Sequence, residues 1–220
     1  SFMTDDVTAA VRDKQEEPPV ATLKAETPGG PFGGAGFGGA RSAPPRKGAD
    51  VSYRLPVPFE EAAALKEQRV TLPNGRSLDI RLPAGVEDGT KIRLAGQGEE
   101  GPGGRGDAIV SVVIQPHRFF ARDGDDVRLD LPVALDEAVL GAKVRVPTVD
   151  GTVMVTVPAG STSGRTLRLK GKGFHGRGGG RGDQLVRLAV DLPADDAELR
   201  RFAEGWSARG ELNPRAALGV

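Results

Sequence analysis

Two glycine-rich stretches come nearest to a chemical motif in this sequence, GQGEEG at 96–101 and GKGFHG at 171–176. Each follows a predicted strand and matches the GxGxxG pattern of dinucleotide-binding sites. In such sites the motif opens a helix, whose amino terminus meets the phosphates of the cofactor. Here both stretches run into more glycine and then another predicted strand. We therefore expect glycine-rich loops and no dinucleotide cofactor.

Metal and nucleophile chemistry has few suitable residues in this chain. The sequence has no cysteine, and its two histidines, His117 and His175, lie far apart and outside any metal-ligand spacing. No Ser-His-Asp arrangement and no isolated pair of carboxylates can be placed in it. We therefore expect no metal, no cofactor and no enzymatic activity.

Four cations gather around the second glycine-rich stretch: Lys170, Lys172, Arg177 and Arg181. A solvated loop is the ordinary interpretation of such a cluster, and a nucleic-acid contact through phosphates is the alternative. No row of aromatic side chains accompanies the cations, as stacking on bases would require. The formal net charge of the chain is zero. DNA binding through these four cations is therefore kept as an alternative function.

A long internal repeat organises the elements that must position these loops. GADVSYRLPVPFEEA, from residue 48, matches GDDVRLDLPVALDEA, from residue 124, and GGRGDAIVSVVI likewise matches GGRGDQLVRLAV. Two copies of one unit therefore cover about residues 48–116 and 124–192. The Arg-Gly-Asp tripeptides at 105–107 and 181–183 are equivalent turns of this repeat, in which we expect the aspartate to accept a backbone hydrogen bond.

Apolar and polar residues alternate within each copy, with the period of two that is typical of half-buried strands. The alternation runs from Val51 in the first copy and from Val127 in the second. Pro56 and Pro132 cannot donate a ladder hydrogen bond, so we expect each of these strands at a sheet edge or at a bulge. Further strands are predicted at 69–72, 77–82, 90–94, 108–114, 143–146, 152–157, 165–169 and 184–190.

Turn and helix signals complete each copy. Asn74-Gly75 and Asp150-Gly151 predict hairpin turns. One or two helical turns are expected at 60–65 and at 136–141, the second closed by Gly141. The predicted fold class is mainly β: two tandem homologous antiparallel-rich β-sandwich-like domains, each with one short helix, plus a C-terminal helix.

The repeat also sets the expected domains, 48–121 and 122–193. Residues 1–47 are rich in glycine and proline, with isolated phenylalanines such as Phe32 and Phe37, and predict a flexible linker. The chain has no apolar run long enough to span a membrane and begins with no signal segment, so a cytoplasmic location is expected.

The last residues, 194–220, predict an amphipathic helix with Asp195 or Asp196 as its N-cap. Its apolar stripe consists of Leu199, Phe202 and Trp206. Such a stripe packs either on the second domain or on another copy of the chain, and the sequence leaves both interpretations open. We consider these three residues candidates for dimerisation.

The repeat, the joint QPHRFFARDGDDV and the paired GGRGD loops resemble the C-terminal region of DnaJ-type co-chaperones, over about residues 48–193. Because no cysteine-rich zinc module interrupts the first copy, the chain is most similar to the CbpA-like, class-B members. The J-domain tripeptide His-Pro-Asp does not occur in this sequence. The resemblance implies a non-catalytic module that binds unfolded client polypeptide, forms a homodimer and cooperates with a DnaK-type chaperone.

The resemblance also implies a site. In this family, client peptide lies in a shallow apolar groove between the first two strands of the first β-unit. Transferred by position, the client-binding residues are Tyr53, Leu55, Val70, Leu72 and Phe120. We expect this groove to be open to water.

Overall fold

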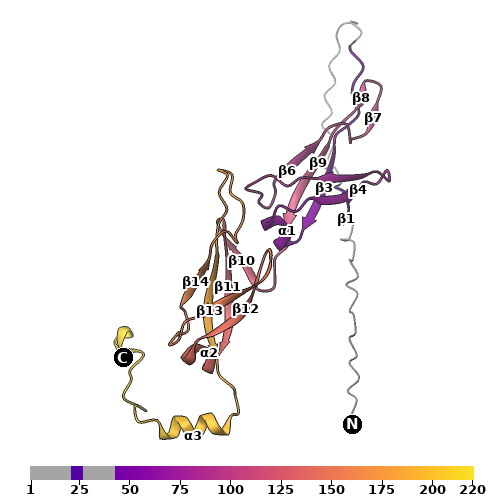
Figure 1. Cartoon of the computed structure of the whole chain (residues 1–220). Helices are drawn as coiled ribbons and strands as arrows, with labels where there is room; N and C mark the ends of the chain where they lie inside the picture. Colours follow the sequence, from indigo (N-terminus) through magenta and orange to yellow (C-terminus); the bar gives the residue numbers. More distant parts are fainter. Residues whose placement is uncertain (1–20, 27–42) are drawn as a thin grey trace, which may run out of the picture. The chain divides into compact units, whose positions relative to one another are not determined.

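The computed structural model describes residues 21–26 and 43–220, which divide between two compact units (Figure 1). The first unit contains the chain through Arg118 together with Phe174–Arg181, and the second contains Phe119–Gly173 and Gly182–Val220. The predicted linker, with Phe32 and Phe37, lies outside the described residues except at 21–26 and 43–47. The fold is mainly β, as predicted.

The first unit has two main sheets, and residues 21–25 of the predicted linker form strands in both. The larger sheet has the order β2-β3-β9-β6 and the smaller one the order β1-β4-β5, with a separate hairpin of β7 and β8. The bounds are β1 Ala21–Thr22, β2 Lys24–Ala25, β3 Val51–Val57, α1 Phe59–Ala63, β4 Gln68–Thr71, β5 Ser77–Ile80, β6 Lys91–Leu94, β7 Glu100–Gly101, β8 Gly104–Arg105 and β9 Ala108–Ile114.

The second unit repeats this plan. Its larger sheet has the order β10-β11-β15-β14, and β12 and β13 form a hairpin (Figure 1). The bounds are β10 Phe120–Asp123, β11 Asp126–Ala134, α2 Leu135–Leu140, β12 Ala142–Thr148, β13 Gly151–Val157, β14 Thr166–Leu169, β15 Gln184–Asp191, α3 Ala197–Gly205 and the 3-10 helix η1 Ala216–Leu218.

The centre of each larger sheet is a parallel pair of strands from opposite ends of one repeat copy. β3 pairs in parallel with β9, from Val51↔Ala108 to Val57↔Ile114, and β11 pairs in parallel with β15. Local periodicity predicts these strands but not their parallel pairing, because the partners are separated by most of a copy. Alternate residues of β3 and β9, such as Leu55 and Val112, are fully buried and form the core beneath the sheet.

The predicted turns and helix ends are present. Gly75 and Gly151 have φ of 85° and 111° at the hairpin turns, where glycine adopts positive φ without steric cost. Gly141 ends α2 with φ 77°. The Ala134 amide at the start of α2 donates to Glu137 Oε1 at 2.8 Å, which satisfies one of the unpaired donors of the first turn.

The glycine-rich loops pack tightly against backbone. A Cβ atom on Gly106 would overlap the carbonyl oxygen of Ala49, and one on Gly182 would overlap that of Asp125. Neither stretch with the GxGxxG pattern opens a helix, since each continues into a turn. The prediction of glycine-rich loops at these positions is therefore confirmed.

One loop of the second repeat copy is part of the first unit. Phe174 is 1% exposed, and its ring meets that of Phe59 edge to face, with the centroids 5.2 Å apart. The Gly85 amide donates to the carbonyl of His175 at 2.7 Å. Residues 174–181 thus contribute a large apolar side chain to the core of the first unit.

Candidate functional site

The four strand residues expected to line a groove lie together in the first unit. Tyr53 and Leu55 belong to β3, Val70 belongs to β4, and Leu72 directly follows β4. Residues two apart on a strand share a face, so each pair presents its side chains to the same side. All four are buried, with exposed fractions between 0% and 5%.

The expectation that this groove is open to water is wrong, because all four side chains are buried. Another part of the chain also lies between β3 and β4. The segment Ala21–Glu26, which contains β1 and β2, pairs in parallel with β4 and then in antiparallel fashion with β3. The Leu23 amide donates to the Thr71 carbonyl at 3.1 Å, and the Glu26 amide donates to the Ser52 carbonyl at 2.9 Å. One extended segment therefore bridges the margins of two sheets.

Leu23 is the apolar anchor of this segment. Ala21 pairs with Val70, so Leu23, two residues further, lies on the same face as Val70 and Leu72. Ala25 pairs with Tyr53, which places Leu23 on the buried face of β3 as well. Leu23 is 1% exposed. Thr22 and Lys24, on either side of it, are exposed.

A cavity of about 240 Å³ lies beside the amino-terminal end of this segment. Ala21 lines it, together with Gln68 from β4 and with Pro56 and Pro58 at the end of β3. Gln68 is 8% exposed, and its side-chain amide donates to the Lys66 carbonyl at 2.9 Å. The space between β3 and β4 therefore continues past Ala21.

The second unit contains the corresponding strands, β11 and β12, with a different arrangement beside them. β10 pairs with β11 only from Phe120↔Leu129 to Asp123↔Asp126. Among the described residues no strand pairs with β12 apart from β13. In the part of the chain that the structure describes, only the first unit has one segment that pairs with strands of both sheets.

Phe120 does not belong to the same unit as the other four predicted residues. It lies on β10 of the second unit, is 5% exposed, and packs against Phe119 with ring centroids 4.7 Å apart. The structure thus brings Tyr53, Leu55, Val70 and Leu72 together and places Phe120 elsewhere. Leu23 joins the four, although no alternation in its short stretch predicts a strand.

The paired Arg-Gly-Asp turns are structural. Asp107 accepts from the Gly96 amide at 2.9 Å and from Arg93 at 2.6 Å. Asp183 accepts from the Gly171 amide at 2.8 Å and from Arg168 at 2.6 Å. The backbone hydrogen bond, and secondly the arginine, lower the pKa of each carboxyl below its ordinary value. The expectation that these aspartates accept backbone hydrogen bonds is confirmed.

The four predicted nucleic-acid contacts divide between the units. Lys170 and Lys172 lie in the second unit, and Arg177 and Arg181 lie in the first. Lys172 is paired with Asp150 at 3.3 Å, and Arg181 forms an isolated β-bridge with His175. Nothing in these contacts favours phosphate over the partners already present, so DNA binding stays a prediction.

The histidines also have structural surroundings. His117 Nε2 lies 2.7 Å from Glu60 Oε1, and its ring lies near that of Phe59. Within residues 21–26 and 43–220, no group of three or more His, Asp or Glu side chains could hold a metal ion. In that same part of the chain, every helix is too short or too polar to cross a lipid bilayer.

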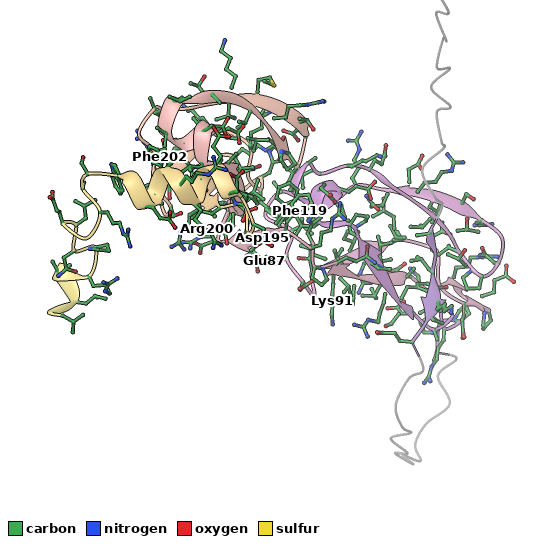
Figure 2. All side chains as sticks on the ribbon, turned by 90° about the horizontal axis from the view of Figure 1, so that it is seen from below. Glu87, Lys91, Phe119, Asp195, Arg200 and Phe202 are labelled. Carbon is green, nitrogen blue, oxygen red and sulfur yellow. The ribbon has the colours of Figure 1, made fainter. Side chains whose placement is uncertain are left out.

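The C-terminal helix α3 exposes its apolar stripe. The Asp196 side chain caps it by accepting from the Leu199 amide at 2.8 Å, which decides between the two predicted caps. No residue of α3 is buried. Phe202 lies on this helix (Figure 2) and is 64% exposed. Trp206, directly after the helix, is 47% exposed. Leu199 is half-buried and, with Phe202, lines a pocket of about 800 Å³ together with residues of β11 and α2, so the second unit covers this stripe only in part.

Comparison with known proteins assigns the family. Residues 46–193, which include β3 through β15, match the family described as "DnaJ C terminal domain". The chain belongs to this family. The segment Ala21–Glu26 lies upstream of the matched residues. The resemblance to DnaJ-type proteins seen in the repeat is thereby confirmed.

Several DnaJ proteins are similar to this chain. It is 45% identical to "Chaperone protein DnaJ 1" of Mycobacterium leprae over 66% of the chain and 39% of that protein. It is 42% identical to a DnaJ-like protein of Synechocystis over 86% of the chain and 57% of that protein. "Chaperone protein DnaJ 2" of Nocardia farcinica is 49% identical over 64% of the chain and 38% of its own length. The chain thus spans between about two fifths and three fifths of these relatives.

Proposed function

We propose that this DnaJ C-terminal region is the non-catalytic client-binding part of a co-chaperone, which holds unfolded polypeptide between β3 and β4 for delivery to a DnaK-type chaperone. One observation carries the proposal: an extended segment fits between these two strands and forms hydrogen bonds to both. The names of the similar proteins, which are chaperones, support the same role.

The proposed groove combines two kinds of recognition. Backbone hydrogen bonds to the carbonyls of Ser52 and Thr71 do not depend on the side chains of the bound peptide. Leu55, Val70 and their neighbours belong to the apolar core next to Leu23, so the proposed groove favours a peptide with an apolar side chain at the Leu23 position. Burial of one leucine contributes roughly 1.5–3 kcal/mol, much of which is offset by the ordering of the peptide. Each groove therefore binds many sequences weakly.

The exposed stripe on α3 fits this role if it joins two copies of the chain. Two linked grooves raise the effective concentration of the second contact, because that contact becomes intramolecular. We therefore include a homodimer formed through Leu199, Phe202 and Trp206 in the proposal. The expected location remains the cytoplasm.

The location of a bound client tests the proposal directly. A short peptide with one central leucine and a terminal nitroxide is added to the isotope-labelled chain, and amide line broadening is measured. We expect broadening at residues 52–55 and 69–72 of the first unit. Residues 128–131 and 145–148, on the corresponding strands of the second unit, serve as the matched control. Broadening confined to the second unit would contradict the proposed groove.

A second measurement shows whether the protein binds clients when no line broadening is seen along β3 and β4. The same protein is tested for suppression of the aggregation of a chemically denatured client. Suppression without any broadening along β3 and β4 would show that clients bind elsewhere on the chain. The groove assignment would then be wrong even though the chaperone function stands.

A further inference from the structure

The segment Ala21–Glu26 has the features of a bound client, although it is part of the same chain. It is extended, inserts one leucine, and pairs its backbone with both β3 and β4. We propose that Ala21–Glu26 is a tethered occupant of the groove, which a client must displace before it binds. This inference rests on the proposed client-binding function.

The hydrogen bonds of the segment define which backbones can replace it. The amides of Leu23 and Glu26 both donate to the groove, so a competing client needs an N–H group at each of these two positions. Proline lacks this donor and is excluded at both positions. The ion pair between Glu26 and Arg54, at 3.5 Å, joins exposed side chains and adds little selectivity.

The side chains of the segment define the preferred apolar pattern. Leu23 is its one fully buried residue, and Thr22 and Lys24 on either side are exposed. Ala21 lines the cavity of about 240 Å³, most of whose other lining residues are polar or charged: Glu61, Lys66, Glu67, Gln68, Arg69 and Gln115, beside Pro56 and Pro58. The groove thus takes an extended segment with one buried leucine between two exposed residues.

The covalent connection to β3 explains how the short segment Ala21–Glu26 stays bound between β3 and β4. Residues 27–50 join Glu26 to β3, so the segment binds its groove intramolecularly, at an effective concentration on the order of millimolar. A client therefore meets a groove that is open for only a fraction of the time. Its apparent dissociation constant is raised by the inverse of that fraction. Weakening the anchor without touching β3 or β4 should tighten client binding.

The experiment uses the full chain and a fluorescent peptide with the sequence of residues 18–28. Three proteins are compared: the unchanged chain, Leu23→Ser, and Thr22→Ser as the matched control at an exposed neighbouring position. We expect Leu23→Ser to bind the peptide at least about tenfold more tightly than the unchanged chain, since it loses most of a buried leucine. Thr22→Ser should stay within about twofold of the unchanged chain.

Amide hydrogen exchange provides an independent readout in the unchanged chain. The Leu23 and Glu26 amides should exchange slowly and lose their protection when the peptide is added to saturation. Equal peptide affinity of all three proteins, with binding at β3 and β4, would overturn the tethered occupant but leave the client-binding function intact. Failure of all three to bind the peptide would overturn the client-binding function, and the competition with it.

Discussion

Phe59 and Phe174 meet edge to face, with an interplanar angle of 89°, although they belong to different copies of the repeat. Phe59 begins α1, directly after the strand that forms one wall of the proposed groove. Phe174 comes from a glycine-rich loop that sequence patterns mark only as a turn. The core beneath the groove therefore depends on a residue more than a hundred positions away in the chain.

Phe174→Ala should destabilise the first unit by about 3–5 kcal/mol, because it removes a fully buried ring and leaves a cavity. The measurement is the opening free energy of the slowest amides in β9, from hydrogen exchange. Leu218→Ala is the control at a position 77% exposed, where less than about 0.5 kcal/mol is expected. Unchanged protection of β9 in Phe174→Ala would contradict the packing role of this ring.

Acid should destabilise the chain partly through Asp107 and Asp183. Their pKa values in the folded state lie below the ordinary value of about 4. The ionised form therefore favours folding above that ordinary value, and this contribution is lost as the pH falls through the lower folded pKa. The double change of Asp107→Asn and Asp183→Asn should lower the urea midpoint at pH 6 and flatten its fall toward pH 2.5.

The control for this pH dependence is Asp130→Asn, at an exposed position of β11. It should leave both the midpoint at pH 6 and the shape of the acid transition nearly as they are. If the double variant followed the same acid transition as the unchanged chain, the two turns would not contribute to it.

Phe202→Asp should prevent self-association through α3, because it places a charge in an apolar contact. Sedimentation equilibrium measures the mass, and we expect a dimer for the unchanged chain and a monomer for the variant. Leu212→Asp is the matched control, since Leu212 is 66% exposed and lies outside the helix. A dimer that persists in Phe202→Asp would place the interface elsewhere.

Ionic strength should separate the client-binding function from DNA binding. Binding of an apolar peptide between β3 and β4 should change by less than about twofold when salt rises fourfold, because it neutralises few charges. Four phosphate contacts, from Lys170, Lys172, Arg177 and Arg181, would weaken DNA binding about 150-fold over the same range. A loss of that size in peptide binding would indicate that charge, and not apolar contact, holds the ligand.

Sequence patterns predict those parts of the fold in which the local order of residues decides the outcome. The alternation in AIVSVVI predicts β9 at 108–114, where the structure has it. The predicted helix end at Gly141 is confirmed for the same reason, since its positive φ is a local property. β12 extends one residue before and two residues after its predicted range, because pairing with β13 continues beyond its apolar residues. β5 ends two residues earlier than predicted, and β10 is not among the predicted strands.

Local sequence patterns do not predict strands that form only by pairing with residues far away in the sequence. Ala21–Glu26 has a single large apolar residue and lies between Pro18-Pro19 and Pro28-Gly29, so it resembles a linker. It forms strands only because β3 and β4 offer unpaired backbone on both sides. The four groove residues could be named from the family resemblance, whereas Leu23, which covers them, could not.

Gly106 and Gly182 are glycines that close packing of the backbone requires. At these two positions the backbone touches a neighbouring carbonyl so closely that even one methyl group would collide with it. Other glycines of the same loops, such as Gly104 and Gly180, have open space at the position of a Cβ atom. Substitution tolerance at Gly106 and Gly182 should therefore be as low as in the hydrophobic interior, although neither residue has a side chain.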